Sequence, residues 1–189
     1  MLSPETYNSL EKIAMTFLLD YSFIEFPVDV FKLAEVSFHV KFIRYSELDK
    51  EKREKILAVP ELEDSFTVFE HWSDGRKTYL IYYNDSKTYY RQRFSIGHEI
   101  KHIIFGEEEP TLEDEEGADY FSKSLIAPKC LVIKNDVSSP EEITAKFELG
   151  PEPSNYLFKT IQNRIDKYGK ELFDYEAKFI EEIEKRLNE

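Results

Sequence analysis

The segment RFSIGHEIKHIIFG, residues 93–106, carries two of the chain's four histidines four positions apart, with a glutamate directly after the first. Residues four apart on an α-helix lie one above the other, so the imidazoles of His98 and His102 can reach one metal ion. Glu99 would then lie beside a zinc-bound water, whose pKa falls to roughly 7, and could accept its proton. The pattern HExxH is typical of this chemistry, and the alternative is a solvent-facing helix with two unrelated histidines.

A set of isoleucines orients this predicted helix. They lie at positions 96, 100, 103 and 104 and share one side of the helix, which must face the core. His98 and His102 project from the opposite side, so the sequence predicts that they face something other than the core.

A third ligand would have to come from another element, and the next predicted helix offers one. In EEGADYFSKSLIAP, Ala118, Phe121 and Leu125 define the buried side. Glu115 and Asp119 share a stripe at its edge, so Glu115 can reach inward as a ligand. Asp119 could then accept the outer ring N–H of a ligating histidine and fix its tautomer. The alternative is that these acids form a solvated helix start, which the helix dipole favours.

The size and composition predict a folded domain without disulfides. The chain has 189 residues, of which 41% are hydrophobic and 15% aromatic, enough for a core in one domain or two small lobes. Cys130 is the one cysteine, which suits a reducing compartment. The first residues lack a basic signal-peptide start, and no apolar run is long enough to span a membrane. We therefore expect a cytoplasmic protein with no membrane contact.

The net charge of −13 argues against nucleic-acid binding. An acidic surface repels phosphate backbones and gains nothing from counterion release. The basic residues are scattered among acids rather than gathered in a patch. We therefore expect no direct contact with nucleic acid.

The order of predicted elements indicates an α+β protein. Helices come first, then a small, mainly antiparallel sheet, then helices to the end. The Asp-Gly turn in SDGR predicts a hairpin of SFTVFEHW and KTYLIYYN. We expect a core in residues 1–128 and a helical C-terminal extension, residues 129–189, packed on it. The other expected elements are a helix from Ser3 to about Leu19, a helix from near Pro27, a strand at 38–45 and helices at 93–106 and 112–127.

HExxH followed by E-x-x-A-D on the next helix resembles the thermolysin-like zinc peptidases with a glutamate ligand. More narrowly, the chain is similar to the ImmA/IrrE-type metallopeptidases over roughly residues 25–166. The matching stretches are PVDVFKLAE, LIYYND, RQRFSIGHEIKHIIF, EGADYFSKSLIAP and the helix-turn-helix-like SPEEITAKFELGPEPSNYLFKTI. The resemblance implies a zincin-like core and a cytosolic zinc-dependent endopeptidase. Such enzymes are commonly paired with a DNA-binding repressor that they cleave.

The resemblance also implies roles for individual residues. His98, His102 and Glu115 become the zinc ligands, Glu99 the general base and Asp119 the partner of a ligating histidine. These roles agree with the helical spacing described above.

Two positions depart from the family's pattern. Lys101 stands where the family usually has a small residue, and Gly117 where it more often has an acid. Neither change removes a ligand. Lys101 could alter how the helix packs, and glycine within a helix costs about 1 kcal/mol relative to alanine.

The sequence leaves two functions open. One is a zinc endopeptidase, and the other is a zinc-binding regulatory or sensor protein with little intrinsic proteolysis. Glu99 favours the enzyme, because a purely structural site needs no base. From the resemblance we expect residues 77–84 to pair with an extended substrate, and the alternative is an ordinary aromatic-rich core strand. The candidates for a second oxyanion donor are Tyr79, Tyr83, His71 and Tyr156.

Overall fold

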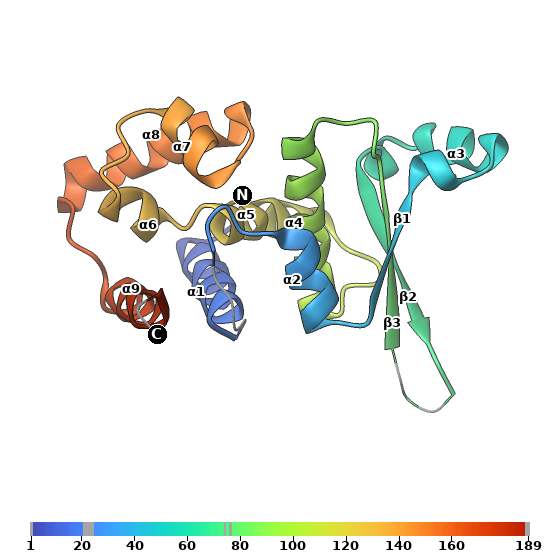
Figure 1. Cartoon of the computed structure of the whole chain (residues 1–189), viewed down its shortest axis with the longest axis horizontal. Coiled ribbons are helices and arrows are strands. Elements are labelled where there is room, and N and C mark those ends of the chain that lie inside the picture. Colours follow the sequence, from blue (N-terminus) through green and yellow to red (C-terminus); the bar gives the residue numbers. More distant parts are fainter. Residues whose placement is uncertain (1, 21–24, 74, 76, 188–189) are drawn as a thin grey trace. The chain divides into compact units, whose positions relative to one another are not determined.

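The computed structural model describes residues 2–20, 25–73, 75 and 77–187, and it confirms the predicted α+β class (Figure 1). The chain forms two compact units. The first comprises Val30–Ser122, and the second joins Leu2–Asp29 to Lys123–Glu189. The second unit therefore groups the N-terminal helix with the C-terminal helices. No helix in the described part of the chain is long and apolar enough to cross a membrane.

A three-stranded sheet is the centre of the first unit. Its order is β1 (Val40–Arg44), β3 (Lys77–Tyr83) and β2 (Ser65–His71). β2 and β3 form the predicted antiparallel hairpin, and β1 pairs with β3 in parallel. Two residues of the predicted turn, Asp74 and Arg76, lie outside the described residues.

This strand order corrects one expectation. The segment at residues 77–84 was expected to pair with substrate, but β3 is the central strand and uses both its edges on β1 and β2. β2 is an edge strand, and within the described residues no strand pairs with its outer edge. Backbone groups for an added strand are therefore offered by β2.

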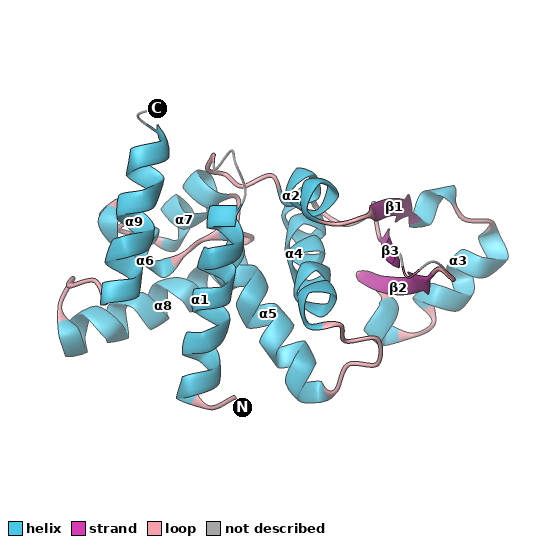
Figure 2. Ribbon diagram, turned by 90° about the horizontal axis from the view of Figure 1, so that it is seen from below, coloured by secondary structure: helices cyan, strands magenta, loops and turns pink. Residues whose placement is uncertain are grey.

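Alternation along the strands sets the two faces of the sheet. Ser65 and Thr67 lie on the same face as Ile81, which is fully buried. Figure 2 shows α2 (Val30–Ser37) and α4 (Tyr89–Phe105) on one side of the sheet. On the other side lies α3 (Lys50–Leu57), with the short 3₁₀ helices Tyr45–Glu47 and Pro60–Leu62 flanking it in the chain.

The histidine-bearing helix α4 begins earlier than predicted. Thr88 caps it, because its hydroxyl accepts a hydrogen bond from the backbone N–H of Arg91. Gly106 ends it with φ of 67°, a left-handed conformation that glycine adopts without strain. Ile96 and Ile100 are fully buried, as their spacing predicts.

The next helix, α5 (Leu112–Ile126), begins with a capping box formed by Thr111 and Asp114. The Thr111 hydroxyl accepts from the Asp114 backbone at 3.3 Å, and the Asp114 carboxylate accepts from the Thr111 backbone at 2.9 Å. The helix starts in the first unit and ends in the second. The cap fixes the first turn of α5, which carries Glu115.

The second unit is helical. It contains α1 (Pro4–Asp20), α6 (Lys129–Lys134), α7 (Pro140–Phe147), α8 (Pro151–Tyr168) and α9 (Asp174–Leu187). A buried ion pair joins α8 to α9, with Arg164 and Glu176 at 2.6 Å. Arg186 of α9 donates to the backbone carbonyl of Leu19 at the end of α1. These contacts explain why the first and last helices form one unit.

Candidate metal centre

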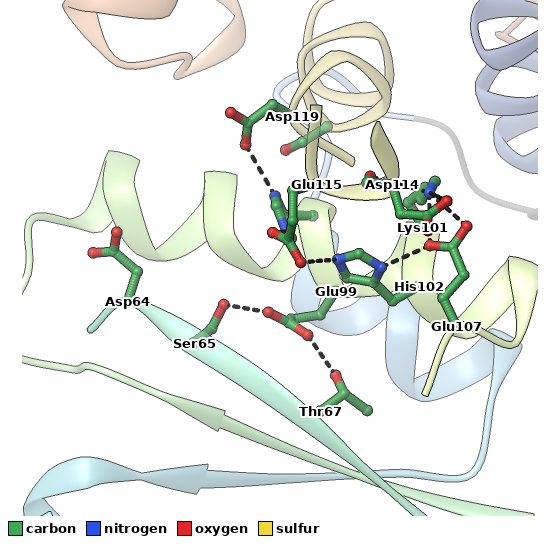
Figure 3. A network of polar contacts seen from close by, with 12 residues as sticks. Asp64, Ser65, Thr67, Glu99, Lys101, His102, Glu107, Asp114, Glu115 and Asp119 are labelled. Atoms are coloured by element: carbon green, nitrogen blue, oxygen red, sulfur yellow. Dashed lines mark hydrogen bonds and ion pairs between the residues drawn. The ribbon is translucent and has the colours of Figure 1, made fainter. Parts of the chain in front are cut away.

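The two histidines of α4 meet one carboxylate of α5. The ligand atoms of His98, His102 and Glu115 all lie within 4.8 Å of one another. One Glu115 oxygen lies 3.0 Å from Nε2 of His98. The other lies 3.6 Å from Nε2 of His102 (Figure 3). Both imidazoles therefore turn the same ring nitrogen towards one point.

The outer ring nitrogens are held by two further carboxylates. Nδ1 of His98 lies 2.9 Å from Asp119, the partner that the sequence predicted for a histidine. Nδ1 of His102 lies 2.7 Å from Glu107, which sequence reasoning missed. In a metal site, a carboxylate that accepts from Nδ1 fixes the tautomer in which Nε2 can bind the metal, and it raises the basicity of Nε2 as a ligand. Glu107 directly follows Gly106, where the helix ends, and it belongs to no periodic pattern. The only signal in the sequence is that Glu107 lies in the acidic run after Gly106.

Glu99 lies beside the histidines and faces the sheet. The Ser65 hydroxyl donates to one of its oxygens at 2.6 Å, and the Thr67 hydroxyl donates to the other at 2.7 Å (Figure 3). The side chain is buried, with the residue 4% exposed. Ser65 and Thr67 were not predicted as site residues. The period-two alternation of β2 puts them on one face, but only the packing of β2 on α4 brings that face to Glu99.

The ionisation states follow from these contacts. Burial lowers the pKa of His98, but hydrogen bonds to Asp119 and Glu115 outweigh it and raise that pKa to about 9. The His98 hydrogen bond lowers the pKa of Glu115. Burial and the neighbouring His98 lower the pKa of His102. In the metal-free protein at neutral pH, a protonated His98 thus joins two carboxylates, and a metal ion would displace that proton.

Glu99 differs from the other acids of the site. Burial raises its pKa, and His98 and the two hydroxyls partly oppose the shift. A carboxyl group with a raised pKa is a better base than an exposed one once it is ionised. The arrangement therefore suits proton transfer at Glu99 and metal binding at Glu115.

A cleft of about 710 Å³ opens onto these groups. Its lining comes from the segment 61–64, β2, α4, the segment 107–111 and the start of α5. Eight of the described lining residues are acidic, and Arg91 is the one arginine or lysine among them. That arginine donates to Asp64 at 2.9 Å. The cleft is therefore a negatively charged approach to the histidines.

The four candidates for a second oxyanion donor lie outside the lining of this cleft. Tyr83 is buried and accepts a hydrogen bond from Arg44. Tyr79 packs edge-on against Phe69. His71 reaches the cleft only through Glu108, which lies 2.7 Å away and is part of the lining. The fourth, Tyr156, belongs to the second unit.

The donor set suits a metal ion. Two imidazole nitrogens and one carboxylate oxygen form the ligand combination of a catalytic zinc site that keeps one position open. His102 and Glu99 are both buried, so this segment is not an ordinary solvent-facing helix. The cluster is compatible with a metal site.

Comparison with protein families agrees with this geometry. Residues 60–125 match the model of the family Peptidase_M78, the IrrE N-terminal-like domain. This confirms the predicted resemblance to the ImmA/IrrE-type family, and the matched segment includes every residue of the site described above. Neither the curated proteins nor the solved structures gave a match. The matched domain is that of a peptidase family, with a protein substrate in general.

Proposed function

We propose that this protein is a zinc-dependent endopeptidase. The observation that carries the proposal is the convergence of His98 and His102 on Glu115, with Glu99 held beside them by two hydroxyls. A zinc site that served structure alone would use four protein ligands and would need no neighbouring base. We assign the metal to His98, His102 and Glu115, and the role of general base to Glu99.

The residues around the site perform distinct steps in this proposal. A zinc ion bound there would supply Lewis acidity towards a peptide carbonyl and lower the pKa of water. Glu99 accepts a proton from the attacking water and returns it to the leaving amine. Asp119 and Glu107 hold the histidine rings in one orientation. Ser65 and Thr67 hold both oxygens of Glu99 while no substrate is present.

The substrate would lie along the outer edge of β2. An extended peptide can add a strand to a free sheet edge through main-chain hydrogen bonds. β2 carries the two hydroxyls that contact Glu99, so a peptide on this edge runs beside the proposed base. The strand proposed for substrate binding is therefore β2 in place of β3.

The substrate that the resemblance suggests is a regulatory protein, in particular a DNA-binding repressor cut at a specific site. A cytoplasmic location suits this partner and the single buried Cys130. The cleft fits a short flexible segment of a protein rather than a folded domain, because an added strand must first be extended. The second candidate, a zinc-binding sensor, would share the ligands but would not use Glu99.

Metal content per chain tests the proposal directly. Elemental analysis of the wild-type protein should give about one zinc per chain, and His98→Ala and Glu115→Gln should each lose it. Glu113→Gln is the matched control, because Glu113 is exposed on the same helix and is not part of the cluster. A wild-type protein that takes up no added zinc would contradict the peptidase and the sensor alike. Zinc binding without cleavage of any candidate repressor would favour the sensor.

A further inference from the structure

Lys101 is an unusual residue to find buried on α4. Its side chain is only 4% exposed, although lysine is almost always at the surface unless it is paired. Its ammonium group donates to both oxygens of Glu107 at 2.6 Å. It also donates to the backbone carbonyl of Asp114 at 3.1 Å and lies 3.6 Å from the Asp114 carboxylate.

These contacts connect both elements that carry the proposed ligands. The Glu107 carboxylate that receives Lys101 also accepts from Nδ1 of His102. Asp114, at the other end of the lysine contacts, directly precedes Glu115. A continuous polar chain thus runs from His102 through Glu107 and Lys101 to the first turn of α5 (Figure 3).

We propose that Lys101 and Glu107 are positioning residues, which together hold His102 and Glu115 at the separation that the metal requires. The inference rests on the proposed function only in taking His102 and Glu115 as ligands. Glu107 alone could rotate away from His102, but Lys101 binds both of its oxygens and fixes the plane of the carboxylate. The contact with the Asp114 carbonyl ties the start of α5 to the same point.

The energetics of buried ion pairs support a positional role. A well-packed apolar pair of similar volume is often as stabilising as a buried ion pair, because both charges must be stripped of water. The Lys101–Glu107 pair is therefore not explained by stability alone. A positioning role explains why the pair contacts both the ring of His102 and the start of α5.

The test is the zinc affinity of the full chain, measured by competition with a chromogenic chelator. Lys101→Met removes the charge and keeps the length of the side chain, and Glu107→Gln keeps its shape. We expect each variant to bind zinc about 10–100-fold more weakly than wild type. The matched control is Glu108→Gln, which removes a neighbouring cleft carboxylate that contacts His71 rather than His102. Its affinity should stay at the wild-type value.

The double variant separates positioning from independent effects. If Lys101 acts through Glu107, the double variant should bind zinc no more weakly than the weaker single variant. The absorption spectrum of the cobalt-substituted protein should shift in Glu107→Gln, because it reports ligand geometry. Urea unfolding of the metal-free variants measures their stability. A loss of zinc affinity in a variant that unfolds like wild type cannot come from a destabilised fold.

Three results would overturn the inference. They are wild-type zinc affinity in both single variants, an equal loss in Glu108→Gln, and a loss of stability without a change in affinity or cobalt spectrum. A wild-type chain that binds no zinc would remove this inference together with the proposed function. A chain that binds zinc in this way but cleaves nothing would remove only the peptidase.

Discussion

The acids of this site show how surroundings give one side-chain chemistry different roles. Glu99 is buried beneath two hydroxyls, and its pKa is raised. Glu115 faces two imidazoles, and its pKa is lowered. Glu107 and Asp119 contact the outer nitrogens of those imidazoles. The proposed base, the proposed ligand and the two carboxylates at the outer nitrogens are thus distinguished by their contacts rather than by residue type.

Replacing Glu99 with glutamine tests its role as base. Glu99→Gln should reduce proteolysis by about 10²–10⁴-fold, because an amide cannot accept the proton from water. Zinc content should stay near that of wild type, since Glu99 is not a ligand in our assignment. Cleavage of a candidate repressor, followed by gel electrophoresis beside a zinc assay, provides both readings. Full proteolysis in the zinc-loaded variant would refute the assignment.

Removing the Ser65 hydroxyl should change the pH dependence of activity. Glu99 must be ionised to act, so activity falls as the pH drops through its pKa. The Ser65 hydrogen bond favours the ionised form and lowers this pKa. Ser65→Ala should therefore move the acidic limb of kcat/KM to higher pH and reduce kcat by roughly 10–100-fold.

The control for this variant is Ser46→Ala, because the Ser46 hydroxyl donates to Asp85 instead of Glu99. Its pH profile should match that of wild type. An acidic limb that stays in place, or moves to lower pH, in Ser65→Ala would show that the hydroxyl does not favour the ionised base. Both variants should be compared at equal zinc content.

At the scale of elements, the close approach of α4 and α5 depends on Gly97. A Cβ at this position would lie 2.5 Å from the Ser122 hydroxyl and 3.2 Å from its Cβ. That hydroxyl donates to the backbone carbonyl of Phe94 at 2.7 Å, which joins the two helices next to the glycine. Gly97 thus allows His98 and Glu115, which lie on the two helices, to meet.

Gly97→Ala should force α4 and α5 apart. We expect it to lower the free energy of unfolding by about 1–3 kcal/mol, the usual effect of overpacking, and to weaken zinc binding. Adding Ser122→Gly removes the two atoms nearest to the new methyl group and should restore much of both properties. Urea unfolding and chelator competition measure them, with Ser122→Gly alone as the control. Failure of the double variant to recover would show that helix spacing is not the cause.

The helices of the second unit depend on a buried charge. Glu176 is fully buried and accepts from Arg164 at 2.6 Å and from the Phe173 backbone at 2.8 Å. Arg164→Met would leave this carboxylate without its partner, and we expect a loss of about 3–5 kcal/mol in the free energy of unfolding. Urea unfolding followed by circular dichroism measures it.

The control is Lys170→Met, which breaks the exposed ion pair with Asp136. Surface pairs contribute at most about 1 kcal/mol, so this variant should unfold almost as wild type does. If both substitutions lowered the free energy of unfolding equally, the buried pair would stabilise α8 and α9 no more than a surface pair does.

At the scale of the whole molecule, charge is the dominant feature. The chain carries a net charge of −13, and eight of the 21 described residues that line the cleft are acidic, against one arginine. A focused negative potential raises the local concentration of cations and repels anions. The same property that disfavours nucleic acid therefore favours a basic protein segment.

Peptide substrates should show this preference. A peptide with lysine or arginine near the cut should have a kcat/KM on the order of tenfold higher than its aspartate or glutamate counterpart. The difference should shrink as salt is added, because salt screens exposed charges. A neutral peptide with glutamine at the same positions is the control. Faster cleavage of the acidic peptide would contradict the prediction.

The sequence by itself determined the features that depend on local spacing. These are the shared direction of the two HExxH histidines, the helix edge that carries Glu115 and Asp119, and the strands of the hairpin, which follow from the periods of helices and strands. Only the tertiary structure decided that β2 lies at an edge of the sheet and that Ser65 and Thr67 contact Glu99. It also decided that Glu107, rather than its neighbours in the same acidic run, binds Lys101 and His102. The physical reason is that local periodicity fixes which way a side chain projects, whereas its partner depends on how separate elements pack.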